Sequence, residues 1–187
     1  MISGQRGQLL IEAMLVLALS GILLAAGLGR AEAWRWNTTA RQWSQHMSSS
    51  LADIRREAML EGHEISLCAT RDGSRCSSSW SGVWLAWHDR NRDGLRQADE
   101  ALRQFTPPLL PGWQLHWRSF RNKPWLLWLA SGDAAESNGT LTLCPPAPHD
   151  AALRQLVISK SGRIRLVQPV RTGTSGLQAA RVVCGWP

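Results

Sequence analysis

The chain has 187 residues and a formal net charge of +7. Apart from a short leader and an apolar N-terminal segment, roughly 150 residues remain, which suffices for one domain with its own core. The charge is uneven, because residues 151–187 contain six Lys or Arg and no Asp or Glu.

The first predicted element is an apolar helix over residues 8–29, in which Glu12 is the only charged residue. Such a helix would be about 33 Å long, enough to cross a hydrocarbon core of about 30 Å. A cleaved secretory signal ending near Ala31-Glu32-Ala33 is one interpretation, although an apolar signal core rarely contains an acid. An ordinary transmembrane anchor is another. A charge at membrane depth is costly and usually functional, so Glu12 needs a specific explanation.

The segment from Arg6 to Gly29 resembles the N-terminus of type IV pilins and pseudopilins. In that family a short basic leader ends in Gly, a prepilin peptidase cleaves after it, and the fifth mature residue is Glu. The resemblance implies cleavage between Gly7 and Gln8, which makes Glu12 the fifth mature residue. It also implies that Glu12 meets the new α-amino group of a neighbouring subunit, so that opposite charge offsets its burial. Gln8 replaces the usual Phe, so we expect cleavage but less efficient N-methylation.

Apolar residues then recur every three or four positions, which predicts that the helix continues to about Glu61 and ends at Gly62. Such a stripe packs on a sheet. Its members are Trp36, Ala40, Trp43, Met47, Leu51, Ile54 and Ala58.

Short runs bounded by Gly, Pro, Asp, Asn and Ser follow, and they read as strands. One long helix followed only by strands predicts an α+β fold, with the helix across an antiparallel sheet. The predicted strands are residues 64–69, 82–88, 113–120, 124–130, 140–144, 155–160 and 163–167.

The four cysteines include no C-x-x-C pair, which argues against a zinc or redox site and favours an oxidising location with two disulfides. Three pairings are possible. We prefer Cys68 with Cys76, which closes a short loop, and Cys144 with Cys184, which ties the C-terminal tail to a strand. Buried free thiols are the alternative.

The segment "DRNRDGLRQADE", residues 89–100, fits the pattern of an EF-hand loop. However, it lies between strands, three arginines dilute its negative charge, and Asp, Asn and Gly are common in tight turns. We therefore expect a turn, with calcium binding as the alternative. The calcium ligands would be Asp89, Asn91, Asp93, the Leu95 carbonyl and Glu100.

Four segments together are similar to the GspH/FimT family of minor pseudopilins, which includes FimT- and FimU-type members. They are "EISLCATRDGSRC", "GVWLAWHDRNRDGLRQADEALRQF", "NGTLTLC" and "QLVISKSGRIRLV". The resemblance implies a pilin-like α+β fold and a minor subunit that acts in type IV pilus assembly. The alternative is a minor pseudopilin of a type II secretion system.

The same resemblance suggests DNA binding during natural transformation, because FimT-type members carry a Gly-Arg-x-Arg motif that Gly162, Arg163 and Arg165 match. On a strand, residues two apart project from the same face. Lys160 and Arg171 could extend a patch that contacts the phosphates of duplex DNA without reading its sequence. The alternative is a basic face that keeps the domain soluble or docks another subunit.

The implied organisation is a leader at 1–7, a transmembrane and filament-core helix at 8–29, and a periplasmic domain at 30–187. We expect a single-pass inner-membrane protein that later enters a filament near its tip. Its partners would be other pilins, the prepilin peptidase and the membrane, with duplex DNA as a further partner.

Enzymatic activity and a cofactor are not expected. The five histidines have no ligand spacing, and neither a Gly-x-Ser-x-Gly motif nor a phosphate-binding glycine loop is present. His88 and Asp89 are adjacent, but neighbours on a strand point to opposite faces.

Overall fold

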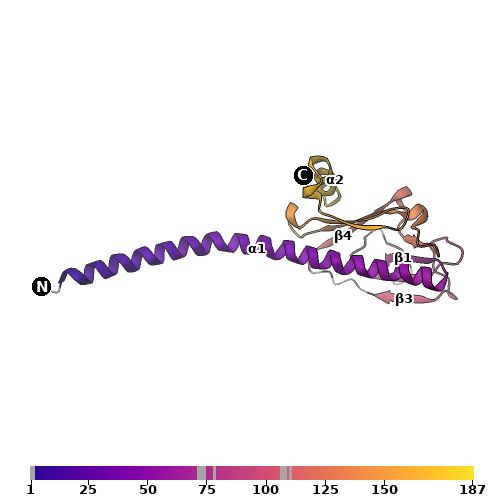
Figure 1. Cartoon of the computed structure of the whole chain (residues 1–187), viewed down its shortest axis with the longest axis horizontal. Coiled ribbons are helices and arrows are strands. Elements are labelled where there is room, and N and C mark those ends of the chain that lie inside the picture. Colours follow the sequence, from indigo (N-terminus) through magenta and orange to yellow (C-terminus); the bar gives the residue numbers. More distant parts are fainter. Residues whose placement is uncertain (1–2, 71–74, 78, 106–108, 110) are drawn as a thin grey trace. The chain divides into compact units, whose positions relative to one another are not determined.

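The computed structural model describes the chain except for residues 1–2, 71–74, 78, 106–108 and 110 (Figure 1). The side chains of residues 3–10, 23–30 and 104–105 are also outside the description. The chain forms two compact units, Met1–Trp36 and Asn37–Pro187, which we describe separately.

The first unit is the N-terminal part of helix α1, which runs from Ser3 to Glu61. Its large apolar side chains between Ile11 and Ile22 are 52–73% exposed. Among the described residues, no helix contains a segment that is both long enough and apolar enough to cross a membrane. The predicted membrane span, residues 8–29, includes residues 8–10 and 23–29, whose side chains are outside the description.

In the second unit, α1 buries one apolar stripe against the rest of the domain. The helix ends at Glu61, where Gly62 has a φ of +68° that terminates it as predicted. The stripe predicted from Ala40 onward is confirmed, since each member is at most 6% exposed: Ala40, Trp43, Met47, Leu51, Ile54 and Ala58.

The strands form two four-stranded antiparallel sheets rather than one. The first has the order β3-β2-β1-β5, with bounds Leu102–Phe105, Val83–His88, Ile65–Thr70 and Leu126–Trp128. The second has the order β4-β6-β7-β8, with bounds Gln114–Ser119, Gly139–Cys144, Arg154–Ile158 and Ile164–Val167. All seven predicted strands are present, and β3 is an additional one.

Tryptophans join the two sheets. The ring of Trp80 lies 4.8 Å from that of Trp84 in β2 and 4.8 Å from that of Trp117 in β4. The Trp80 indole N–H donates to the Pro124 carbonyl, and the Trp84 indole N–H donates to the Trp80 carbonyl. Large rings with a single polar atom thus fill the interior between the sheets.

The expectation that only strands follow the long helix is wrong, because helix α2 covers Thr174–Val183. A disulfide from Cys184 to Cys144 in β6 holds α2, as does an ion pair from Arg181 to Asp150. Short 3₁₀ segments complete the description: η1 Phe120–Asn122, η2 Ala135–Ser137, η3 Asp150–Ala152 and η4 Pro169–Arg171.

Candidate functional site

The predicted cleavage and assembly residues lie in α1, in the first unit. Gly7 and Gln8 lie in α1, but their exposure and contacts are outside the description, and Glu12 is exposed. No ion pair of Glu12 is found within the described part of the chain. The roles of these three residues therefore remain predictions.

Gly162 closes the hairpin between β7 and β8. Its N–H donates to the Ser159 carbonyl at 2.9 Å, and the Ser159 N–H donates to the Arg163 carbonyl at 3.0 Å. Gly162 has a φ of +75°, and a Cβ added there would lie 1.9 Å from the Gly132 carbonyl oxygen. The position thus requires glycine both for the turn and for the close approach of the two backbones.

Arg55 of α1 fixes this hairpin to the domain. Its Nε donates to the Gly132 carbonyl at 2.7 Å, and its Nη2 donates to the Ser161 carbonyl at 3.4 Å. The Ala134 N–H donates to the Lys160 carbonyl at 2.9 Å. The hairpin backbone is therefore held at Lys160 and at Ser161, while the Lys160 side chain remains exposed.

Arg163 and Arg165 share the solvent face of the second sheet. Arg165 lies opposite Val157, whereas the flanking partners Leu156 and Ile158 are buried on the other face. Arg163 precedes β8, and its carbonyl continues the strand pairing to Ser159. Both arginines are exposed. In the described residues, neither they nor Lys160 take part in an ion pair.

Arg171 stands apart from the other predicted basic residues. It lies in η4, after the end of β8 that is far from the hairpin. Burial is the main cause that lowers the pKa of Arg154. The nearby positive charges of Arg171 and Arg41 lower it further. Arg154 is itself buried and donates to the Ala151 and Leu153 carbonyls at 2.7 Å and to Asn37 Oδ1. The hairpin thus gathers Lys160, Gly162, Arg163 and Arg165, but not Arg171.

The loop from Asp89 to Glu100 uses its carboxylates to bind its own backbone. Asp89 Oδ2 accepts from Ser66 Oγ at 2.6 Å and from the Gly94 N–H at 2.9 Å. Glu100 accepts from the N–H groups of Arg90 and Gln97, at 3.2 and 2.9 Å. Both carboxylates are buried. This arrangement is that of a turn whose carboxylates bind its own backbone, so that Asp89 and Glu100 already have partners.

The Asp93 carboxylate caps the same turn. It accepts hydrogen bonds from the Leu95 N–H at 2.6 Å and from the side-chain amides of Asn91 and Gln97. The hydrogen bond from Leu95 is the main cause that lowers the pKa of Asp93. Asp93 and Asn91 therefore also serve the loop itself.

One group of possible metal ligands was missed by the sequence reasoning. Ligand atoms of Glu57, Glu61 and His88 lie within 4.8 Å of one another. His88 Nε2 is 3.0 Å from Glu61 Oε2, and Arg103 Nη1 is 3.0 Å from Glu57 Oε2. The spacing of the two glutamates on α1 was the only available signal, because the positions of His88 and Arg103 depend on strand pairing. These contacts join α1 to the first sheet.

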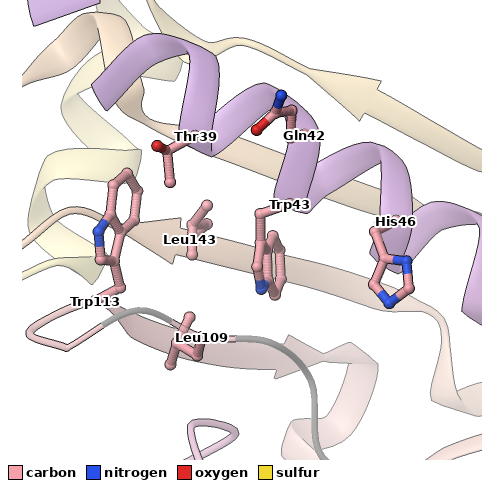
Figure 2. A pocket seen from close by; sticks show the side chains of 7 residues that line it. All are labelled: Thr39, Gln42, Trp43, His46, Leu109, Trp113 and Leu143. Atoms are coloured by element: carbon pink, nitrogen blue, oxygen red, sulfur yellow. The ribbon is translucent and has the colours of Figure 1, made fainter. Parts of the chain in front are cut away.

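A cavity of about 310 Å³ lies between α1 and the second sheet (Figure 2). Its lining is Thr39, Gln42, Trp43, His46, Leu109, Trp113 and Leu143. Figure 2 shows the Trp43 ring pointing away from α1 into this space. The Trp43 indole N–H is buried and has no partner in the described residues. His46 is the only titratable residue among the described residues of this lining.

The predicted disulfide partners are joined in the structure. Cys68 in β1 is bonded to Cys76, and Cys144 in β6 is bonded to Cys184. These are the two pairs that we predicted from the sequence.

The chain is similar to one protein family and to several solved structures. Residues 44–162 match the model of a family described as type II transport protein GspH. The crystal structure of the type IV minor pilin FimU of Pseudomonas aeruginosa has a TM-score of 0.53 at 19% identity, covering 70% of this chain and 89% of that one. A second FimU crystal form has a TM-score of 0.51 at 20% identity, covering 68% and 91%.

The minor pseudopilin EpsH of the type 2 secretion system of Vibrio cholerae has a TM-score of 0.49 at 21% identity, covering 70% of this chain and 97% of that one. No curated protein sequence matches the chain. At these identities the likeness to FimU establishes the fold alone, and it confirms the predicted pilin-like α+β architecture.

Proposed function

Because the chain belongs to the GspH family, we propose that it is a minor pilin or pseudopilin, a subunit of a type IV pilus or of a type II secretion pseudopilus. The observation that carries this proposal is the uncovered apolar surface of α1 between Ile11 and Ile22. Such a surface needs a membrane or neighbouring subunits to cover it. A bundle of these helices in a filament core would cover it and would give Glu12 a partner.

The proposal includes processing and location. Residues 1–7 are the leader that a prepilin peptidase removes, residues 8–29 anchor the chain in the inner membrane, and residues 30–187 lie in the periplasm. The two disulfides agree with that oxidising location. The anchor later becomes the filament core, where the other pilins are its partners.

The test of this proposal is cleavage after Gly7. Gly7→Val should leave an uncut precursor when the full chain is expressed with a prepilin peptidase, as judged by N-terminal mass spectrometry. Gly4→Val, the same substitution three residues earlier, should still be cleaved to a chain that begins at Gln8. Normal cleavage of Gly7→Val would refute the pilin-type processing.

A second function is favoured by the unpaired cations of the β7–β8 hairpin. Lys160, Arg163 and Arg165 are exposed, and no described acid pairs with them. We propose that they bind the phosphates of duplex DNA, with little sequence preference, as in uptake during natural transformation. Arg171 would contribute less, because η4 lies at the other end of β8.

The corresponding experiment measures the affinity of the full chain in detergent for duplexes of unrelated sequence. Arg163→Ala with Arg165→Ala should weaken binding and lower the slope of log affinity against log salt by about one unit per lost contact. Arg90→Ala with Arg92→Ala is the matched control, since those arginines already pair with Asp99 and Glu64. Equal affinity of the hairpin variant and the parent would remove the DNA-binding function and leave assembly.

A further inference from the structure

The strand register places a second arginine on the same face as Arg165. In the second sheet, Arg118 of β4 lies opposite Thr140 of β6, Thr140 opposite Val157 of β7, and Val157 opposite Arg165 of β8. Directly paired residues project from the same face of a sheet. Arg118 and Arg165 are therefore the two ends of one row that crosses all four strands.

The next row toward the hairpin follows the same pattern. The Phe120 N–H donates to the Asn138 carbonyl at 2.7 Å, and the Ser159 N–H donates to the Arg163 carbonyl at 3.0 Å. Phe120 is 55% exposed. This row ends at Arg163, so the face carries Arg118, Arg163 and Arg165 around a centre of small, uncharged side chains.

This part of the face is open, whereas the opposite end is covered. Thr140, Thr142 and Cys144 follow one another at two-residue intervals along β6 and so share this face. The disulfide of Cys144 holds α2 on the side of the sheet away from α1 (Figure 1). Thr142 is only 2% exposed, while Thr140 and Val157 are partly exposed. The cover thus ends between Thr142 and Thr140, and the arginine rows remain accessible.

The charge of Arg118 is not neutralised by an acid in the described residues. It is exposed, like Arg163 and Arg165. Arg121, three residues further on, differs because its Nη1 lies 2.6 Å from Glu136 Oε2. Arg118 is therefore available to an anionic partner, and Arg121 is already paired.

We propose that duplex DNA lies across the four strands of the second sheet, and that Arg118 is a phosphate contact at the far side from Arg165. This inference rests on the proposed DNA binding. Three strand intervals separate the two backbones by about 14 Å, close to the roughly 12 Å width of a major groove. The two arginines can therefore reach the phosphate backbones on the two sides of one groove.

The experiment compares five forms of the full chain in detergent, the parent and four variants, by titration of one labelled duplex at several salt concentrations. Arg118→Ala should lower the affinity about eightfold at 0.1 M salt, which is the counterion-release factor for one phosphate, and should lower the salt slope by about one unit. Arg118→Lys should keep the slope, because it keeps the charge. Arg121→Ala is the matched control, and it should bind like the parent.

The hairpin variant Arg163→Ala with Arg165→Ala separates the two proposals. If it loses affinity while Arg118→Ala binds like the parent, DNA contacts are confined to the hairpin and the crossing orientation is refuted. If the parent binds no DNA, both proposals fail together. If Arg121→Ala weakens binding as much as Arg118→Ala, the effect is one of overall charge and the specific role of Arg118 is refuted. Unchanged thermal unfolding of each exposed variant verifies that folding is not the cause.

Discussion

At Gly162 the backbone adopts a φ of +75° and approaches the carbonyl oxygen of Gly132, a residue 30 positions earlier in the chain. Any side chain there would collide with that carbonyl and with the Arg55 Nε, which a Cβ would approach to 2.6 Å. The glycine of the "SGRIR" motif therefore serves the fold. A loss of DNA binding on its substitution would not identify it as a DNA contact.

Gly162→Ala should lower the free energy of unfolding by about 1 to 3 kcal/mol or more, because it combines an unfavourable φ with a clash. Thermal or denaturant unfolding measures this loss. Gly173→Ala is the matched control, since Gly173 has a φ of +92° but no atom within 4 Å of an added Cβ. Equal losses in the two variants would contradict the close approach to Gly132.

Residue-level prediction succeeded where the controlling pattern is local. The alternation of Arg163 and Arg165 predicts a common face, and the three- and four-residue spacing predicts the buried side of α1. The role of Arg118 depends on pairing through β6 and β7, and the group of Glu57, Glu61 and His88 depends on where β2 meets α1. Such juxtapositions are tertiary, and apart from the four-residue spacing of Glu57 and Glu61 on α1 they leave no spacing signal in the sequence.

Among the elements, α2 is a helix whose sequence has a weak intrinsic tendency to be helical and which depends on tertiary contacts. Its ten residues, "TSGLQAARVV", include a glycine and two β-branched valines, and only Ala180 is buried. Such a short helix is marginal alone. Its attachment through Cys184 and Arg181 supplies the missing stabilisation, which is why the sequence pattern did not predict it.

Replacing Cys144 and Cys184 by Ser should lower the free energy of unfolding by about 2 to 4 kcal/mol, because the bond closes a loop of 40 residues. Amide hydrogen exchange in residues 174–183 should also become faster. The Cys68–Cys76 pair closes a loop of only 8 residues, so its double Ser variant should lose less. Unchanged protection of α2 without Cys144–Cys184 would contradict its role as the tether.

The second attachment of α2 should depend on pH. Arg181 Nε lies 2.8 Å from Asp150 Oδ1, and this hydrogen bond lowers the pKa of Asp150 below its ordinary value. The ion pair therefore stabilises the folded state above the unfolded pKa of about 3.9, and that contribution is lost as the pH falls through the lower folded pKa. Asp150→Asn should be less stable than the parent from pH 5 to 8, with a difference that shrinks below about pH 4. A difference that persists in acid would contradict the ion pair.

The strands also show which part of the sheet arrangement is local. The seven predicted runs are strands because each is a short stretch rich in apolar and β-branched residues that is bounded by turn residues, which is a local pattern. Strand β3, "LRQF", has four residues and no apolar alternation, and it is a strand because it pairs with β2. The division into two sheets follows from long-range pairing, such as that of β1 with β5, which the sequence pattern does not specify.

For the whole molecule, the distribution of surface chemistry matters more than any cavity. The first unit exposes apolar side chains from Ile11 to Ile22, and the second unit exposes arginines on the second sheet that pair with no described acid. The first surface suits a lipid or a bundle of identical helices, and the second suits an anion. Insertion of the first unit in a filament core would cover its apolar surface.

The most direct test of the filament role is the protein content of sheared, purified filaments from the cells that encode the chain. The parent should be present with Gln8 as its first residue, and the variant with Arg163→Ala and Arg165→Ala should be incorporated equally. Glu12→Ala should be cleaved normally yet be depleted from filaments, because the neighbouring α-amino group loses its counter-charge. Recovery of Glu12→Ala in filaments at the parental level, or absence of the parent from every filament fraction, would contradict the account.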